Sequence, residues 1–302
     1  MKVPAAVTAF LLALSLLMAL PGRAEAAPGL CSSSSHAALA ARISRGIEAA
    51  RRGRESFVAL EVDDPAAGVV CRLDSGTHFD SASVVKVTIL GTLLRDAQTA
   101  HRSLTARERA LAWAMITRSD NGAASALWDE DGRLRLQRFL DAAGMTETVL
   151  GPGGAWGLTR ITAADETRLL WLLLKPNRVL DTSSRDYELA LMADVIPAQR
   201  WGVPAGAPRS LVVHVKNGWL PLAPFGWRIN SIGGFTGGAR QHGGEDYSIV
   251  VLTEDNPTMT YGVDTVERIA EAVNRDLNPG AIARVPAAVI PAAQQVPDET
   301  LP

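Results

Sequence analysis

Segments with strand character lie in two groups that are far apart in the chain. The first group is Ser56 to Asp63 and Gly68 to Leu73, with the turn signal Asp64-Pro65 between them. The second group comes late in the chain and is rich in β-forming residues: Leu211 to Lys216, Trp227 to Ile232 and Tyr247 to Thr253. Because none of these strands can bury an apolar face alone, both groups are expected to join in one sheet.

Apolar residues recur at helical spacing before, between and after the strand groups. Helices are predicted at His36 to Arg52 and at Tyr261 to Leu277, on either side of the strands. Between the two groups, the same spacing predicts helices at Ser83 to Ala97, Leu104 to Thr117, Arg133 to Ala143, Thr162 to Leu174 and Tyr187 to Val195.

This order predicts an α/β (α+β) fold. A five-stranded, mostly antiparallel sheet is flanked by the N- and C-terminal helices and carries an inserted, all-helical lobe. The expected boundaries are an α/β part at 36–80 and 205–278 and a lobe at 81–204. A cleft between sheet and lobe is the expected place for a functional site.

The N-terminal residues have the pattern of an export signal. Lys2 precedes the apolar run Ala5 to Leu20, Pro21-Gly22 breaks it, and small residues flank Glu25. We predict a signal peptide at 1–26, a linker at 27–35 and a disordered Pro- and Ala-rich tail at 279–302. The mature protein is then secreted or periplasmic without a stable membrane anchor; an uncleaved anchor is the alternative.

Charge and cysteine content limit the partners. The formal net charge is −2, which gives no strong field for nucleic acid or an anionic membrane. No His or Cys pair has metal-ligand spacing, so no metal is expected. No other cofactor is expected, and the protein is expected to be a monomer. Cys31 and Cys71 are the only cysteines. An exported chain can pair them, but two separate buried thiols stay open as the alternative.

Lysine is scarce, and one lysine stands in an apolar helix. The 30 basic residues include only four lysines, and Lys86 lies in the apolar run Val84 to Leu90, three residues after Ser83. A desolvated Lys can lose its proton near neutral pH, whereas Arg cannot. Lys86 is therefore a candidate base for Ser83 as a nucleophile. Such a Ser-x-x-Lys spacing occurs about once by chance in a chain this long, so a capping Ser beside an incidental Lys is the alternative.

Two further motifs follow in the chain. Ser119-Asp120-Asn121 lies in a turn between predicted helices, where a hydroxyl can relay a proton and an amide can orient Lys86. Each of its residues is also an ordinary helix cap. Lys216-Asn217-Gly218 ends a predicted strand, where Lys216 can hold substrate charge and Gly218 lets a ligand's backbone approach.

Together these motifs resemble the Ser-x-x-Lys, Ser-Asp-Asn and Lys-Thr-Gly set of class A β-lactamases and penicillin-binding proteins. The resemblance extends over residues 36–278 and implies an acyl-enzyme on Ser83 with Lys86 as base. It implies that Ser119 relays protons, that Asn121 orients Lys86 and that Lys216 binds substrate charge. The substrate-binding residues would be Asn217, Gly218 and Trp219, with the oxyanion held by the backbone N–H groups of Ser83 and Trp219.

The chain departs from the family pattern at three points. Residues 151–158 match the loop that carries the water-activating Glu in class A enzymes, but contain no acid. Asn217 stands where the family has Thr or Ser, whose hydroxyl helps to bind a substrate carboxylate. Fewer residues than usual separate Ser83 from Ser119, which indicates a trimmed lobe. Acylation is expected, whereas rapid hydrolysis of a β-lactam is not implied.

The sequence therefore predicts an exported serine hydrolase acting on an amide, peptide or β-lactam. One alternative is a D,D-peptidase-like or other acyl-transfer enzyme, and another is a secreted binding protein without turnover. A Ser-His-Asp triad is disfavoured because no Gly-x-Ser-x-Gly elbow exists, although His214 lies two residues before Lys216. Four tryptophans either line the cleft or fill the core: Trp156, Trp201, Trp219 and Trp227.

Overall fold

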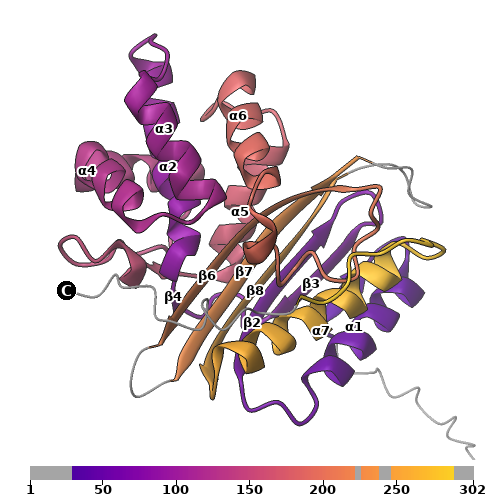
Figure 1. Ribbon diagram of the computed structural model, residues 1–302. Helices are drawn as coiled ribbons and strands as arrows, with labels where there is room; N and C mark the ends of the chain where they lie inside the picture. The colour runs from indigo at the N-terminus through magenta and orange to yellow at the C-terminus, as the bar shows by residue number, and fades with distance from the viewer. Residues whose placement is uncertain (1–28, 222–225, 238–245, 289–302) are drawn as a thin grey trace, which may run out of the picture.

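The two strand groups form one twisted sheet with helices on both faces (Figure 1). The computed structural model describes residues 29–221, 226–237 and 246–288, so the expected signal peptide at 1–26 lies outside the described residues. Across those three ranges, no helix has the length and apolar character needed to cross a membrane.

The sheet joins both ends of the chain. Its order is β1-β3-β2-β8-β7-β6, and every pairing between neighbours is antiparallel. The two strand groups meet where β2 pairs with β8, from Phe57 opposite Glu254 to Asp63 opposite Ser248. The strands are β1 (Cys31–Ser33), β2 (Phe57–Asp64), β3 (Val69–Leu73), β6 (Val212–Pro221), β7 (Trp227–Thr236) and β8 (Tyr247–Asn256).

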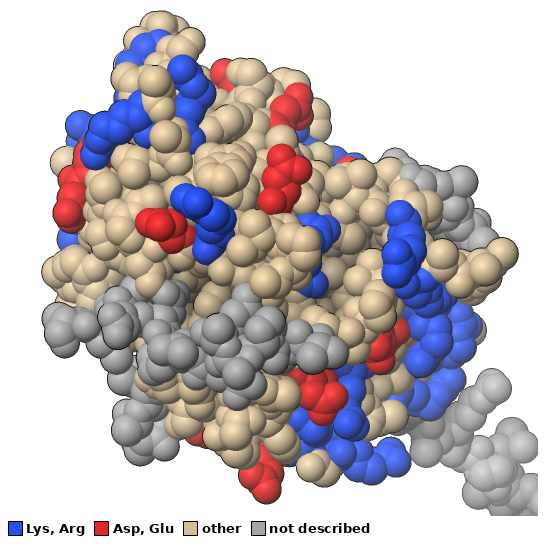
Figure 2. Space-filling model, in the orientation of Figure 1, with Lys and Arg blue, Asp and Glu red and all other residues tan. Residues whose placement is uncertain are grey.

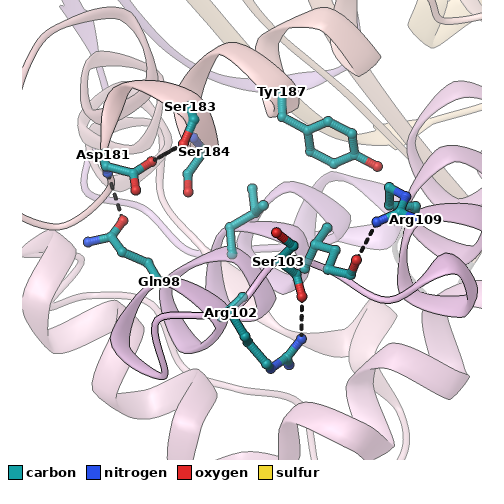
Figure 3. A pocket seen from close by; sticks show the side chains of 11 residues that line it. Gln98, Arg102, Ser103, Arg109, Asp181, Ser183, Ser184 and Tyr187 are labelled. Atoms are coloured by element: carbon teal, nitrogen blue, oxygen red, sulfur yellow. Dashed lines mark hydrogen bonds between the residues drawn. The ribbon is translucent and has the colours of Figure 1, made fainter.

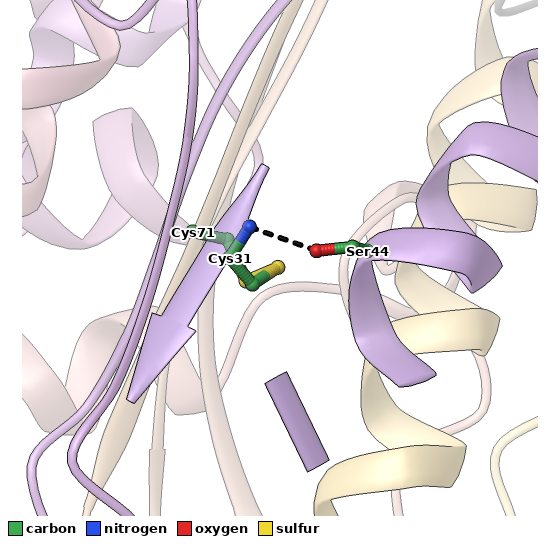
Figure 4. The surroundings of a disulfide bond; sticks show 3 residues. All are labelled: Cys31, Ser44 and Cys71. Carbon is green, nitrogen blue, oxygen red and sulfur yellow. Dashed lines mark hydrogen bonds between the residues drawn. A yellow bond between two sulfur atoms is a disulfide. The ribbon is translucent and has the colours of Figure 1, made fainter. Parts of the chain in front are cut away.

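The predicted fold class is confirmed, with one strand more than expected. Cys31–Ser33, predicted as part of a linker, forms the edge strand β1 opposite β3. Figure 4 shows the disulfide between Cys31 and Cys71, which are direct partners in that pairing. The Cys31 N–H also donates to Ser44 Oγ at 2.9 Å, which ties β1 to α1 (Ala37–Arg51). Cys31 and Cys71 therefore form a disulfide, and the alternative of two separate buried thiols is wrong.

Helices α1 and α7 (Met259–Leu277) cover one face of the sheet side by side. Their buried residues fall at helical spacing, such as Leu39, Ile43 and Ile47 on α1. These side chains form one apolar core with the facing strand residues. The first and last helices thus pack where the sequence predicts.

The helical lobe lies on the opposite face. Its helices are η1 (Ala82–Val85), α2 (Lys86–Thr99), α3 (Ala106–Thr117), α4 (Asn121–Ala143), α5 (Ala163–Leu174) and α6 (Thr182–Ala193). Four short elements complete the lobe: β4 (Phe79–Asp80), η2 (Trp156–Leu158), β5 (Arg160–Ile161) and η3 (Pro197–Gln199). Strands β4 and β5 pair with each other in a separate two-stranded sheet. Helix α4 starts earlier than predicted because it continues across a break at Gly132, whose φ is +69°.

Part of the expected tail is ordered against the α/β part. Residues 283–288 run beside the loop before β6, where Val285 exchanges backbone hydrogen bonds with Gly206 and Ala207. The Ala288 N–H donates to the carboxylate of Glu267 on α7, which also accepts from Gly202 N–H at 3.1 Å. The prediction of a disordered tail is therefore wrong for 283–288, and its remainder at 289–302 lies outside the described residues.

Candidate active site

Ser83 lies in the tight turn that opens helix α2. The turn is the 3₁₀ helix η1, and the backbone N–H of Lys86 donates to the Ser83 carbonyl. Ser83 and Lys86 are both fully buried. Ala82 has a φ of +46°, a strained conformation for a residue with a Cβ. Such strain is characteristic of functional sites, where surrounding packing holds the chain in place.

The Lys86 ammonium is held by the turn between α3 and α4. Its Nζ donates to the Ser119 carbonyl at 2.7 Å, to Ser119 Oγ at 3.1 Å and to Asn121 Oδ1 at 2.6 Å. Asp120 does not face the lysine; it caps α4 by accepting from the Ala123 N–H. The side chains of Ser119 and Asn121 thus meet Lys86 as the sequence predicts.

Lys216 reaches the same hydroxyl from the sheet. Its Nζ donates to Ser119 Oγ at 3.0 Å and to the Asn217 carbonyl at 2.8 Å. A hydroxyl oxygen has two lone pairs, and Lys86 and Lys216 occupy both. When both lysines act as donors, the Ser119 hydroxyl hydrogen is directed away from them. Ser119 itself has a φ of +56°, a second strained residue in the same site.

Gly218 permits a close approach, but the backbone that approaches it belongs to the Ser83 turn and not to a ligand. A Cβ at Gly218 would lie 2.7 Å from the Ser81 carbonyl oxygen and 2.9 Å from the Ser83 nitrogen. Real Cβ atoms do not approach backbone atoms so closely. The sequence predicted room for a ligand's backbone here, and the structure instead places the Ser83 turn directly against β6.

Asn217 has a different role from the one predicted. Its Nδ2 donates both hydrogens to backbone carbonyls, those of Gln199 and Trp201, each at 2.8 Å. The amide nitrogen has only two hydrogens, so it cannot also donate to a substrate carboxylate. The substrate-binding prediction is wrong for this amide group, which anchors the 199–201 loop.

Trp219 is buried beside that loop. Its ring meets Trp201 edge to face, with centroids 6.0 Å apart, and both rings belong to the core shared with α7. Its position on β6 immediately follows Gly218, so its backbone lies next to the Ser83 turn.

Trp156, one of the four tryptophans that the sequence left open between cleft and core, lies beside Lys86. It comes from the 151–158 stretch, and Lys86 Nζ lies 4.7 Å from the centroid of its ring. Its indole N–H donates to Ser125 Oγ at 3.1 Å, and the ring is almost fully buried. The only sequence signal was a large aromatic residue where the resemblance led us to look for an acid.

His214 is excluded from the site by its contacts. Its Nδ1 bonds to the Leu189 carbonyl at 2.7 Å and its Nε2 to Thr236 Oγ1 at 2.9 Å. Burial lowers the pKa of the ring, so His214 is a neutral, packed residue with both nitrogens engaged. Within the described ranges, no group of three or more metal-ligating side chains is placed to hold a metal.

A cavity of about 280 Å³ lies elsewhere, between α2, α3 and α6 (Figure 3). Its lining includes Arg102, Arg109, Asp181 and Tyr187. Lys86, Lys216 and the residues bonded to them do not line it. Arg102 is bound to Glu108, whose pKa this hydrogen bond lowers to about 2. The cavity is thus a polar feature of the lobe and separate from Ser83.

Comparison with known proteins gives one family. The model of the beta-lactamase enzyme family matches residues 107–277. This segment contains Ser119, Asn121 and Lys216, while Ser83 and Lys86 precede it. LppW of Mycobacterium tuberculosis and Mycobacterium bovis, which carries the name of a lipoprotein, is 28% identical over 193 residues. That match covers 62% of this chain and only 60% of LppW.

Solved structures share the fold at low identity. A class A beta-lactamase from Bacteroides cellulosilyticus has a TM-score of 0.68 and 18% identity, covering 79% of this chain and 98% of its own. A beta-lactamase from Chitinophaga pinensis has a TM-score of 0.68 and 16% identity, with 78% and 99% covered. A PBP-A variant, solved as an acyl-enzyme complex with penicillin G, has a TM-score of 0.65 and 16% identity, with 78% and 95% covered.

Proposed function

This chain belongs to the beta-lactamase enzyme family, and we propose that it is a serine hydrolase that forms an acyl-enzyme on Ser83. The observation that carries the proposal is the convergence of Lys86 and Lys216 on Ser119 Oγ, at 3.1 and 3.0 Å. Three segments far apart in the sequence supply this network. Two buried lysines bound to one hydroxyl are costly for stability and are explained by chemistry at that hydroxyl.

The proposed first step is attack by Ser83 Oγ on the carbonyl carbon of an amide. Lys86, in its neutral form, takes the Ser83 proton as the O–C bond forms. The backbone N–H groups of Ser83 and Trp219 stabilise the developing oxyanion. The Ser119 hydroxyl then gives its hydrogen to the leaving nitrogen, the C–N bond breaks, and the Lys86 ammonium returns a proton to Ser119.

Water completes the proposed cycle by attacking the ester on Ser83. No acid lies in 151–158 to activate this water, so we propose that deacylation is slower than acylation. The substrate class is an amide, a peptide or a β-lactam. Because the Asn217 amide is bound to loop carbonyls, we propose that Lys216 supplies the charge for an anionic substrate group. The export signal read at 1–26 supports action outside the cytoplasm.

The test is intact-mass analysis of the mature protein after reaction with penicillin G and with a small fluorophosphonate. We expect one adduct per chain with each reagent, absent in Ser83→Ala and retained in Ser183→Ala. Ser183 is a matched control, since it is a serine of the lobe that bonds only to Asp181 among the described side chains. An adduct that survives Ser83→Ala contradicts the proposal, and so does the absence of any adduct. Binding without an adduct would support the non-turnover alternative.

A further inference from the structure

We propose that Trp156 is a positioning residue for Lys86 and that its ring shields the Ser83 ester from water on the lysine side. This inference rests on the proposed function, because it concerns the lifetime of the acyl-enzyme formed there. It is motivated by the loop that would hold a water-activating acid and that presents an indole ring to Lys86 instead.

The loop that carries Trp156 is fixed in place. Arg133 on α4 donates to the carbonyls of Gly151 at 2.7 Å and Leu150 at 3.2 Å. The Gly151 N–H donates to Thr159 Oγ1, and a Cβ at Gly151 would lie 2.1 Å from the Ala155 carbonyl oxygen. The loop is therefore folded tightly on itself, and only glycine fits at this crossing.

Helix α4 holds the ring and the lysine at once. Asn121 Oδ1 accepts from Lys86 Nζ at 2.6 Å, and Ser125, one turn further along α4, accepts from the Trp156 indole at 3.1 Å. Residues four apart share a helix face, so the two anchors are neighbours. The ring then lies 4.7 Å from the ammonium that Asn121 orients.

An aromatic face suits an amine that must lose and regain a proton. Its negative quadrupole attracts the ammonium, which holds Lys86 in a site where burial disfavours charge. Unlike a carboxylate, the ring cannot accept the proton or activate water. Trp156 is almost fully buried, and its short helix η2 packs against η1, which carries Ser83, so we place the ring on one side of the ester, where it keeps water out. The result is a site that acylates and then releases its acyl group slowly.

The first experiment observes the contact itself. Uniform ¹³C-lysine labelling of the mature protein reports on three lysines only, Lys86, Lys175 and Lys216. The ring current of Trp156 is expected to move the Lys86 Hε resonances upfield. Trp156→Leu removes this shift, Trp156→Phe retains most of it, and Trp113→Leu leaves it unchanged. Trp113 is the matched control because its ring also has a cation at 4.7 Å, that of Arg118, on the outer side of the lobe.

The second experiment separates acylation from deacylation. In Trp156→Leu we expect Ser83 labelling to slow roughly tenfold and the acyl-enzyme to decay several-fold faster, whereas Trp156→Phe stays within about threefold for both. An unshifted Lys86 resonance in the wild type overturns the inference even if no adduct forms. If folded Trp156→Leu has the same acylation rate and the same decay rate as the wild type, the inference is overturned and the proposed function stays intact. Absence of an adduct in the wild type overturns the proposed function and with it the shielding of the ester, while the Lys86 shift still decides whether Trp156 positions Lys86.

Discussion

Two ammonium groups share one hydroxyl oxygen in this molecule, that of Ser119. Lys86 also has an amide oxygen and an aromatic face as neighbours, while Lys216 is bonded to its own strand. The two lysines thus differ in what they can do. We propose that Lys86 exchanges a proton with Ser83 and that Lys216 binds a charged substrate group.

The first prediction follows from this difference. Lys86→Arg is expected to lower the rate of Ser83 acylation by roughly a hundredfold or more, because a guanidinium does not give up its proton. Lys216→Arg keeps the required charge and is expected to cost roughly tenfold or less. Both rates are measured by intact-mass analysis against time, with thermal unfolding as the check on folding. Wild-type acylation in Lys86→Arg would exclude the lysine as base.

The sequence identified most of the network but not its inner contacts. Motif spacings identified Ser83, Lys86, Ser119, Asn121 and Lys216, and the last four are joined by hydrogen bonds around Ser119. Ser83 lies in the turn η1, which directly precedes Lys86 at the start of α2. The hydrogen-bond partners of Asn217 lie in the 199–201 loop. The residues around Asn217 carry no signal for this contact.

At the scale of elements, Glu267 on α7 joins two segments that local patterns left undefined. One carboxylate accepts the N–H of Gly202, next to the loop that Asn217 anchors, and the N–H of Ala288, in the returning chain. Burial raises the pKa of Glu267 to about 7, and these two N–H groups oppose that rise. Because the folded pKa exceeds the ordinary value of about 4.5, Glu267 favours folding in acid and loses that effect as the pH rises to 7.

The second prediction concerns this pH dependence. Between pH 4.5 and 7 the ionisation of Glu267 is expected to cost the folded state roughly 3 kcal/mol. Glu267→Gln should flatten that part of the curve of unfolding free energy against pH. Burial raises the pKa of Asp131 to about 8. Asp131 therefore contributes a slope of the same sign to the unfolding free energy of both the wild type and Glu267→Gln. The measurement is therefore the difference in slope in urea unfolding, with Glu271→Gln on α7 as control. An identical slope in Glu267→Gln contradicts the assignment.

Element types were predictable, and so were the ends of the most periodic helices, whereas the shortest elements were not. Side-chain periodicity indicated α1, α5 and α7. Helix α3 begins after Thr105, which forms a capping box with Glu108. Strand β1 has three residues, too short for any periodic signal, and forms only because β3 offers it a partner. The segment 283–288 is likewise ordered by the loop and helix against which it lies.

At the scale of the whole molecule, charge is spread over the surface. Figure 2 shows basic and acidic side chains interspersed over one face, with basic groups over the tip of the lobe and over the α1 side. Two apolar cores lie beneath this surface, one on each face of the sheet, and burial of apolar side chains is the main term that favours folding. The Cys31–Cys71 bond adds a covalent link at the sheet's edge.

The third prediction concerns that link, which closes a loop of sequence separation 40. Cys31→Ala with Cys71→Ala is expected to lower the free energy of unfolding by about 4 kcal/mol, through the greater freedom of the unfolded chain. Urea unfolding of both proteins, with and without dithiothreitol, measures the loss. The reductant should weaken the wild type and leave the double variant unchanged. Equal midpoints for the oxidised wild type and the double variant would contradict the prediction.

The pairing of β2 with β8 sets an order of assembly. A ribosome delivers β2 and β3 first, and about 180 residues later the last strand that completes their sheet. The lobe helices are contiguous in sequence and can begin to form in between, because local contacts close faster than distant ones. The Ser83 turn and Lys216 lie on segments that the sheet joins through β7 and β8, so we expect them to come together only after those strands have been made. The proposed active site is therefore expected to form late, together with the pairing of β2 and β8.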